Sequence, residues 1–476
     1  MLESEKKLGY GWMLFAVFSL VFAGIFAFLV AMARTPYIED ILPLGGDYIY
    51  VALVGHVILA VVIWFLAFEG FMWVLTSTVH LGQPQRSPLL GWLSLASASL
   101  GTALIVITAI FGLGEAELAN YVPILIHPLF YTGLALFAAG IVLNLVNTFG
   151  TLLKARAEWK TEKKERKPFP ILTLGMAAAA VAVAVAFICF GLSGFFQFIT
   201  GKAFFDLERF FWGGGHVLQF ANTIAMVTVW VYLARLTLGR EPIGRKAAVG
   251  AYLYYLAFVA AAPFVYFIHD TATQAYKELF TEIMRWGLGP PTMVFVLAVV
   301  YMLVTKKGTE FEGRALPWGN PGFSSLVLSM AVFMLGGVLA LMISGVNTII
   351  PAHYHCVIGA VTIAFMGLFY EVLPLLNRSI YSKRMAKIQP YLYSLGIVLF
   401  AAGLFIAGTH GVQRKTYGAE QNLDTIWKTL GMGIMGVGGL VAIAGGITFV
   451  WNALLSLLRR PLKCGESGEG AEGGEA

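Results

Sequence analysis

Two histidines stand two residues apart near the start of an apolar segment that runs from about 349 to 376. Side chains at positions i and i+2 of a helix point roughly 200° apart, because the helix has about 3.6 residues per turn. His353 and His355 therefore cannot bind one metal from a regular helix, but each can serve a different centre on opposite sides of it. Histidine is rare and costly inside a bilayer, so the pair indicates a functional site rather than two interfacial side chains bonded to carbonyls.

A third histidine is suited to share a heme with this pair. His56 stands alone in the apolar stretch 54–59, as expected of one axial ligand of a buried heme, and His355 is its expected partner. A heme iron held by two histidines has no free coordination position, which suits electron transfer rather than substrate binding. His353, facing the other way, is then expected to hold a second, high-spin heme whose far face stays open.

Three further residues have the types expected of a second metal site opposite that open face. His216 lies near the start of another apolar segment, and the adjacent pair His269-Asp270 ends the segment after it. Neighbouring residues at a helix end point about 100° apart, which is close enough to share one metal. Two imidazoles and one carboxylate form the ligand set typical of a non-heme iron site.

The composition indicates the elements that must position these residues. The chain has 476 residues, of which 58% are hydrophobic and 12% charged, and its mean hydropathy is +0.78. Such values, with repeated apolar runs of about 20 residues, predict an all-α integral membrane protein. The runs predict about twelve transmembrane helices, near 10–33, 49–76, 89–113, 121–148, 170–194, 208–236, 247–269, 288–305, 323–346, 349–376, 390–409 and 428–457. Residues 1–464 are thus expected to form one helical membrane domain, followed by a disordered Gly/Glu-rich tail at 465–476.

The basic residues predict how the chain is oriented. Seven Lys and Arg lie between 154 and 167, and more lie at 240–246, 306–314 and 378–387, whereas the alternate connections are acidic or mixed. Positively charged loops stay in the cytoplasm, so both termini are expected inside and Glu39-Asp40, Glu115, Glu117, Glu278 and Glu282 outside. The net charge of +6 is therefore explained by loops, and it gives no reason to expect nucleic-acid binding.

With this orientation, six histidines from five helices share one depth in the outer third of the membrane. They are His56, His127, His216, His269, His353 and His355. Scattered structural histidines would not converge in this way, so the pattern favours a site with several metal or heme centres. His127 matches no ligand position, and a supporting role beside the site is the favoured interpretation. No acidic residue lies midway along the sixth or seventh segment, so neither segment shows a strong proton path.

Several motifs match one known family. The segments AHYH at 352–355 and GLFYEVLP at 367–374 resemble the tenth-helix pattern of the heme–copper oxidase superfamily catalytic subunit (subunit I). FWGGGH at 211–216 is similar to the sixth-helix motif that carries one ligand of the active-site metal. GVQRK at 411–415 resembles the region after the eleventh helix, which implies that Arg414 and Lys415 hold heme propionates. The resemblance covers nearly the whole chain and implies a low-spin heme, a high-spin heme and non-heme iron or copper.

Two departures from the family pattern bear on the substrate. The family's seventh helix normally ends in two adjacent histidines, whereas this chain has His269-Asp270. Most oxygen reductases of the family carry a tyrosine four residues after the sixth-helix ligand, but here that residue is Phe220. One oxidase group places its tyrosine on helix seven, where Tyr266 lies three residues before His269; a structural tyrosine is the favoured interpretation.

Both departures favour nitric oxide reduction. Coupling two nitric oxide molecules to nitrous oxide needs two electrons and two protons and breaks no oxygen–oxygen bond, so no tyrosine is required. The resemblance implies that reductases of this superfamily lack the tyrosine and commonly use iron with a carboxylate ligand, here Asp270. Well-known nitric oxide reductases carry glutamates on helix six, where this chain has Gln219 and Asn222, so it is expected to be a divergent member.

Other functions remain open on the sequence alone. One is a terminal oxygen reductase, either a cytochrome c or a quinol oxidase, of the same superfamily. Another is an electron-relay membrane cytochrome with two bis-histidine hemes, and a more distant one is a transporter. No Cys-x-x-Cys-His motif occurs, so electrons are expected from an anchored donor subunit of cupredoxin or cytochrome c type, or from quinol. The expected location is the cytoplasmic membrane of a prokaryote, in contact with membrane lipid and within a respiratory electron-transport chain.

Overall fold

The computed structural model describes residues 3–37, 46–161, 168–200 and 205–459 of the chain. Within these ranges, twelve helices are long and apolar enough to cross a membrane, and this confirms the predicted all-α membrane fold. The spans are α1 (Glu3–Arg34), α2–η1–α3 (Gly46–Val57, Ile58–Ile63, Trp64–Ser77), α4 (Pro88–Ile110), α5 (Pro128–Thr161), α6 (Ile171–Ile199), α7 (Leu207–Leu238), α8–η3–α9 (Arg245–Ala261, Ala262–Phe264, Val265–Ile268), α10 (Gln274–Thr305), α11 (Pro321–Leu341), α12 (Ile349–Val372), α13 (Lys383–Thr409) and α14 (Ile426–Leu458). The short elements are β1 (Glu115–Glu117), β2 (Ile124–Ile126), η2 (Val79–Leu81), η4 (Leu373–Leu376) and η5 (Gly418–Gln421).

Two helix starts differ from the predicted ones. The fourth span begins at Pro128 rather than near 121, because β1 and β2 pair as an antiparallel hairpin just before it. The eighth span begins at Gln274 rather than near 288, and it contains Pro290 and Pro291 in its interior. Its first turns carry Lys277, Glu278 and Glu282. These charged residues interrupt the apolar run, so a prediction based only on apolar length places the start of the helix too late.

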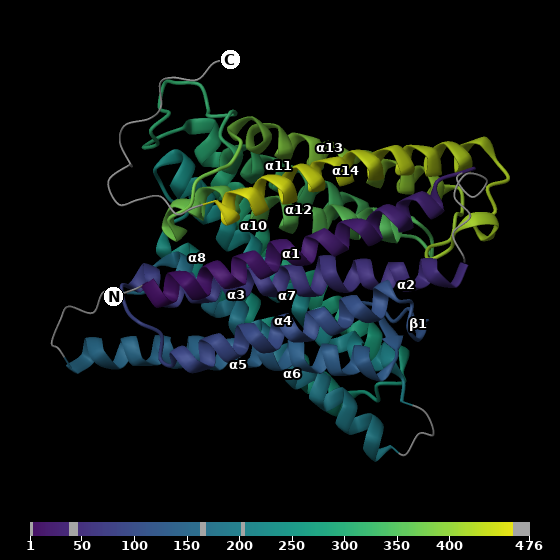
Figure 1. Cartoon of the computed structure of the whole chain (residues 1–476), viewed down its shortest axis with the longest axis horizontal. Coiled ribbons are helices and arrows are strands. Elements are labelled where there is room, and N and C mark those ends of the chain that lie inside the picture. The colour runs from purple at the N-terminus through teal and green to yellow at the C-terminus, as the bar shows by residue number, and fades with distance from the viewer. Residues whose placement is uncertain (1–2, 38–45, 162–167, 201–204, 460–476) are drawn as a thin grey trace.

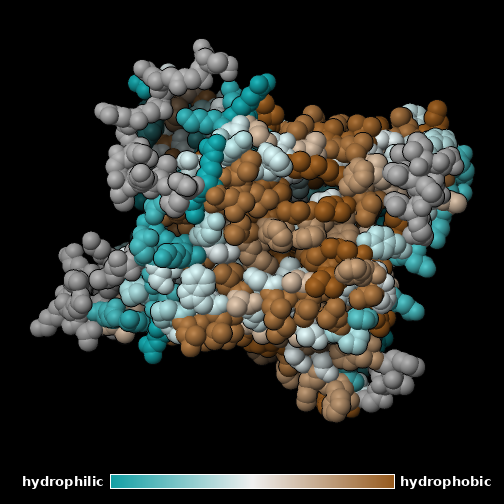
Figure 2. All heavy atoms as spheres, in the orientation of Figure 1, coloured by the Kyte–Doolittle hydropathy of each residue, from teal (hydrophilic) through white to brown (hydrophobic). Residues whose placement is uncertain are grey.

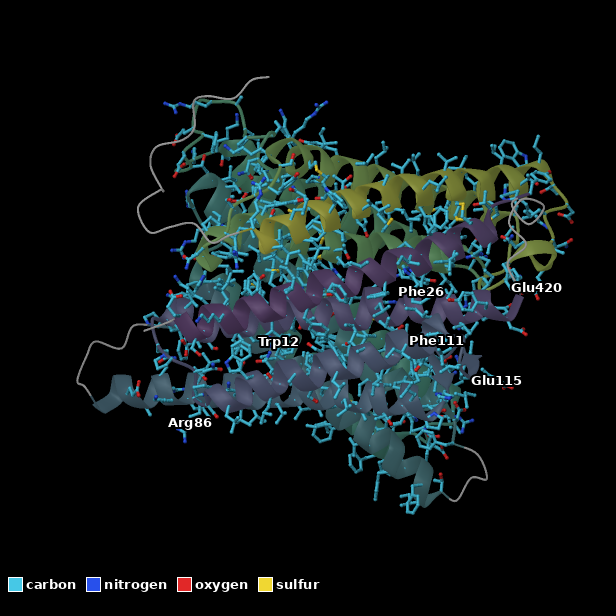
Figure 3. All side chains as sticks on the ribbon, in the orientation of Figure 1. Trp12, Phe26, Arg86, Phe111, Glu115 and Glu420 are labelled. Carbon is cyan, nitrogen blue, oxygen red and sulfur yellow. The ribbon has the colours of Figure 1, made fainter. Side chains whose placement is uncertain are left out.

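The helices run between two polar ends of unlike charge. Figure 1 shows the N-terminus at one end and β1 at the other, and Figure 2 shows a broad hydrophobic band between polar ends. Arg86 lies at the N-terminal end, here named the basic side, and Glu115 and Glu420 lie at the opposite end, here named the acidic side (Figure 3). Loops on the basic side contact one another, as where Arg240 donates to the carbonyl oxygen of Lys307 at 2.7 Å. The basic residues at 163–167, the pair at 39–40 and the tail at 465–476 lie outside the described residues.

Glycines let two pairs of neighbouring helices touch backbone to backbone. A Cβ atom at Gly396 or Gly403 of α13 would collide with the backbone of α14 at Ala442 or Met435. A Cβ at Gly101 of α4 would collide in the same way with α5. Small residues at helix interfaces permit such close packing, which drives helix association in lipid, where the hydrophobic effect contributes little.

Three spans form the centre of the bundle. The spans of α7, of α12 and of α2–η1–α3 have the largest shares of buried residues among the twelve found in the described ranges. These spans also carry His216, His353, His355 and His56. The histidines therefore lie on the helices that are best shielded from lipid, as expected of ionisable groups inside a membrane.

Candidate functional site

The two histidines of α12 face different neighbours. The Nδ1 atom of His353 lies 2.8 Å from the carbonyl oxygen of Gly336 on α11. The ring of His355 packs instead against Phe400 of α13, with ring centroids 4.6 Å apart, and against the ring of Tyr354. The α12 helix thus directs its two imidazoles to opposite sides, as the spacing predicts.

His56 is an electrostatic neighbour of His355, and the axial pairing of the two stays a prediction. His56 is the last residue but one of α2, just before the π-helical turn η1, and its Nδ1 lies 3.2 Å from the carbonyl oxygen of Ala23 on α1. It lies within electrostatic range of His355, and so does Arg34 at the end of α1. In both histidines Nδ1 meets a backbone carbonyl, which for His355 is that of Pro351 at 2.7 Å. Such a bond fixes the tautomer and leaves Nε2 with a lone pair for a metal.

Arg34 supplies an independent test of whether a heme fits here. Its Nε and one terminal nitrogen are buried and have no hydrogen-bond partner among the described residues. A buried cation without an anion is costly, so the site requires a negative group beside Arg34. Heme propionates are such groups, and Arg414 acts electrostatically on the same Tyr354 side chain as Arg34. The residues around His56 and His355 therefore fit a bound heme.

His216 is buried beneath a loop from the acidic side. It is 2% exposed, its Nδ1 lies 2.7 Å from the carbonyl oxygen of Trp212, and its Nε2 lies 3.0 Å from the hydroxyl of Tyr121. The three preceding glycines make room for aromatic rings: a Cβ at Gly215 would lie 2.5 Å from Tyr121, and one at Gly214 would meet Phe190. Bulkier residues at these positions of α7 would push the rings away from His216.

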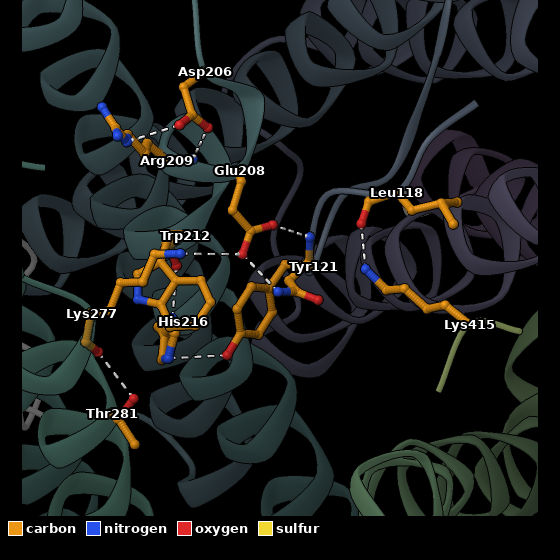
Figure 4. A network of polar contacts seen from close by, with 11 residues as sticks. Leu118, Tyr121, Asp206, Glu208, Arg209, Trp212, His216, Lys277, Thr281 and Lys415 are labelled. Atoms are coloured by element: carbon orange, nitrogen blue, oxygen red, sulfur yellow. Dashed lines mark hydrogen bonds and ion pairs between the residues drawn. The ribbon is translucent and has the colours of Figure 1, made fainter. Parts of the chain in front are cut away.

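The loop that carries Tyr121 is anchored by a polar network (Figure 4). Glu208 accepts hydrogen bonds from the backbone and side-chain nitrogens of Asn120, both at 2.6 Å, and lies 3.9 Å from the Nζ atom of Lys277. These contacts hold Tyr121 in a left-handed conformation with φ of 70°, which is uncommon for a residue other than glycine. Burial raises the pKa of the Tyr121 phenol, so its hydroxyl stays protonated and donates to His216.

His269 and Asp270 lie at the end of α9, where the chain leaves the helix in an extended conformation. Asp270 is exposed, and its Oδ1 accepts a 2.7 Å hydrogen bond from the backbone nitrogen of Ala272 in the turn before α10. No three His, Cys, Asp or Glu side chains in the described ranges stand close enough together to hold a metal ion. The donor types suit a non-heme iron, but Asp270 would have to leave its turn to join His216 and His269, so the three-ligand set stays a prediction.

The predicted propionate pair lies on the acidic side, after α13. Lys415 donates through Nζ to the carbonyl oxygen of Leu118, in the same loop as Tyr121. Burial lowers the pKa of Lys415 from its ordinary value, with Arg414 acting in the same direction. A bridge between Asn347 and Gln413 joins this connection to the start of α12. The pair is thus tied to both the α12 histidines and the His216 loop.

The remaining predicted residues have structural partners. Phe220 is fully buried and packs where a Cβ at Gly287 would lie, so the sixth-helix tyrosine position holds a phenyl ring within the core. Tyr266 packs edge-on against Tyr276 and Phe280. The Nδ1 of His127 accepts from the backbone nitrogen of Leu129, which places His127 at the start of α5 as a cap.

A small cavity lies beside the Tyr121 loop, between α7 and the span of η1 and α3. Its lining comes from η1, α3, α7 and the Tyr121 loop, and consists of Val61, Val62, Leu66, Tyr121, Gly215, Leu218, Gln219 and Asn222. Sequence reasoning missed Tyr121 and Arg34. A lone arginine at the outer end of the first span could have signalled an anion there, whereas nothing in the sequence shows that Tyr121 folds back onto His216.

Comparisons with known proteins agree with this fold. A family model described as cytochrome c and quinol oxidase polypeptide I matches residues 7–442. An uncharacterized protein of Rickettsia prowazekii is 27% identical over 94% of this chain and 95% of its own length. Cytochrome c oxidase subunit 1 of Thermus thermophilus is 23% identical over 90% of this chain and 79% of its own. A heme-copper terminal oxidase, solved as a dimer by cryo-electron microscopy, superposes with a TM-score of 0.78 at 18% identity, covering 96% of this chain and 85% of that chain.

Proposed function

The chain belongs to the cytochrome c and quinol oxidase polypeptide I family, and we propose that within this family of multi-pass heme oxidoreductases it reduces nitric oxide to nitrous oxide. The observation that carries the proposal is the presence of phenylalanine at position 220. The residue one turn after His216 has a phenyl ring where an oxygen reductase needs a phenol, and it is fully buried in the core. The carboxylate in His269-Asp270 supports the same conclusion, because it suits iron rather than copper.

Each histidine has a distinct task in this proposal. His56 and His355 would hold the low-spin heme, and His353 would hold the high-spin heme. His216, His269 and Asp270 would hold a non-heme iron or copper. When bound, the high-spin heme and the non-heme metal supply the redox chemistry that joins two nitric oxide molecules. Carbonyl contacts at Nδ1 orient the imidazoles of His56, His216, His353 and His355, and the apolar helices exclude water around them.

Arg34, Arg414 and Lys415 have a supporting task in the same proposal. They neutralise the heme propionates on the acidic side, where Arg34 offers buried nitrogens without partners in the described ranges. Arg–carboxylate pairs are directional as well as strong, so Arg34 and Arg414 would also help to orient a bound heme.

A second candidate is a terminal oxygen reductase, a cytochrome c or quinol oxidase. The names of the Thermus relative and of the structural match favour it. A phenol also reaches the site from outside α7, because the Tyr121 hydroxyl lies 3.0 Å from His216. An electron-relay cytochrome is a third candidate, and it would lack any heme that binds carbon monoxide.

Turnover of the purified enzyme separates these candidates. Supplied with electrons and nitric oxide without oxygen, the enzyme is expected to form nitrous oxide, and oxygen uptake in a parallel experiment is expected to be slow. Fast oxygen uptake without nitrous oxide formation would refute the proposal and favour the oxygen reductase. Spectra of the reduced enzyme with and without carbon monoxide provide the control. If carbon monoxide changes no heme band, the protein has no reactive high-spin heme and is the electron relay.

The proposal also covers the surroundings of the enzyme. The basic side faces the cytoplasm of a prokaryote, since Arg240, Lys306 and Lys383 lie in its connections. Electrons come from an anchored subunit with a cupredoxin or cytochrome c domain on the acidic side, or from quinol in the membrane. Residues 1–464 form the catalytic membrane domain in this proposal, and the Gly/Glu-rich tail at 465–476 follows it.

A further inference from the structure

A carboxyl group lies deep in the bundle with no role in the site described so far. Glu69, on α3, is 0% exposed, and neither of its side-chain oxygens has a hydrogen-bond partner among the described residues. Trp73, one turn nearer the basic side on the same helix face, likewise has a buried indole nitrogen without a described partner. Burying such groups without partners is costly, so their retention needs an explanation.

The face of α3 that carries Glu69 also carries a residue that lines the cavity beside the Tyr121 loop. Leu66 lies three residues before Glu69, so the two side chains are neighbours on one helix face, about 4.5 Å apart along the axis. Leu66 lines the cavity that also contacts Gln219, Asn222 and Tyr121. The Tyr121 hydroxyl in turn contacts His216. Glu69 therefore lies about one helical turn from a residue that lines the cavity, toward the basic side.

A series of buried polar side chains leads from the basic side toward Glu69. At its outer end, Glu5 accepts from the backbone nitrogen of Gln85 at 3.4 Å, and the Gln85 side chain accepts from Asn147 at 2.8 Å. One turn deeper on α5, Asn144 lies 3.5 Å from the hydroxyl of Thr148 and donates to the carbonyl oxygen of Gly70 at 3.3 Å. Gly70 is the residue next to Glu69.

This series has the features of a conduit rather than of ordinary packing. Its members from Glu5 to Asn144 are each no more than 5% exposed, although they are polar residues among apolar helices. On α5 they recur at positions 144, 147, 148 and 151, which form one face of the helix. Amides and hydroxyls of this kind can line a path for water and protons, and ionisable residues within spans are typical of proton relays.

We propose that Glu69 is a proton-holding residue that passes protons from the basic side to the cavity beneath His216. The Glu69 carboxyl gives its proton toward the cavity when the site is reduced, and the resulting carboxylate takes up a new proton through the series that ends at Asn144. No bond other than O–H breaks or forms. The assignment rests on the proposed function only in requiring a reaction that consumes protons, which reduction of nitric oxide and reduction of oxygen both do.

Infrared difference spectra of the purified holoenzyme test the role of Glu69 directly. The reduced-minus-oxidised spectrum is expected to contain a carbonyl-stretch signal of a protonated carboxyl group that Glu69→Gln abolishes. The matched control is Glu371→Gln, which removes a half-buried carboxyl at the end of α12 and is expected to leave the signal unchanged. A signal that survives in Glu69→Gln overturns the proposal.

Proton uptake tests the path. With a pH-indicating dye, uptake on reduction by an outer-sphere one-electron donor that releases no protons is expected to slow at least tenfold in Glu69→Gln and in Asn147→Val, while Asn147→Val keeps the infrared signal. Uptake at the unmodified rate in either variant overturns the proposal. If Glu69→Gln does not retain heme, Glu69→Asp replaces it: a shifted signal supports the assignment, and an unshifted one overturns it. Neither measurement needs nitric oxide or oxygen, so a failure of the proposed activity leaves both readouts valid.

Discussion

The hydrogen bond between Tyr121 and His216 predicts that a phenol competes with the metal for one nitrogen. The Nδ1 of His216 donates to the carbonyl oxygen of Trp212, so Nε2 is the atom left for a metal, and the Tyr121 hydroxyl lies 3.0 Å from it. Tyr121→Phe removes the hydroxyl and keeps the ring that packs against Gly215. A metal that binds Nε2 then no longer has to displace a hydrogen bond.

The size of the effect follows from the net value of one hydrogen bond. Such bonds contribute about 0.5–1.5 kcal/mol, and about 1.4 kcal/mol corresponds to a tenfold change in an equilibrium constant. The metal-depleted Tyr121→Phe enzyme is therefore expected to bind iron(II) roughly 2- to 10-fold more tightly than the unmodified enzyme. Competition with a chelator of known affinity measures the Kd, and Tyr131→Phe, at a 42% exposed position of α5, serves as the control.

Two results would refute this reasoning. An unchanged Kd in Tyr121→Phe would mean that the phenol leaves Nε2 free in solution. A weaker Kd would mean that Tyr121 supports the bound metal instead of competing with it, for example by holding the imidazole in place. In either case the loop anchored by Glu208 would not limit access to His216.

Three further substitutions test the rest of the site. Asp270→Ala is expected to remove the non-heme metal while both hemes remain, as metal analysis and optical spectra would show; full metal content and activity would rule out the carboxylate as a ligand. Arg34→Gln is expected to speed loss of the low-spin heme at least tenfold, because hydrogen bonds to charged groups contribute about 1.5–3 kcal/mol, and heme content unchanged after dilution would argue against a propionate there. Gly215→Ala is expected to lower stability by about 1–3 kcal/mol because its Cβ would lie 2.5 Å from Tyr121. Thermal unfolding measures this, with Gly337→Ala, which has open space around it, as the control, and equal midpoints for both variants would contradict the clash.

Local pattern was sufficient to predict the architecture and the directions of the α12 histidines. Apolar length predicts each of the twelve spans, because a helix that crosses lipid must satisfy its own backbone and present apolar side chains over its whole length. The opposite directions of His353 and His355 follow from helix geometry alone. The same criterion failed at the start of α10, where Lys277 and Glu282 interrupt the apolar run although the helix continues.

Contacts between distant segments were beyond the sequence, and they decide the details of the site. Tyr121 contacts His216, which is 95 positions away in the chain, and Asn120 contacts Glu208, which is 88 positions away. No local sequence pattern predicts the fold of the loop that makes these contacts. Glu69 stands out in the sequence as a charge in an apolar run, but only the packing of α5 against α3 brings Asn144 to the carbonyl oxygen of the next residue, Gly70. The sequence by itself determined how many helices cross the membrane and which residue types they carry inward, because both follow from periodicity and solvent. Tertiary structure alone decided which side chains meet, because that depends on how the helices pack and where the loops between them fold back.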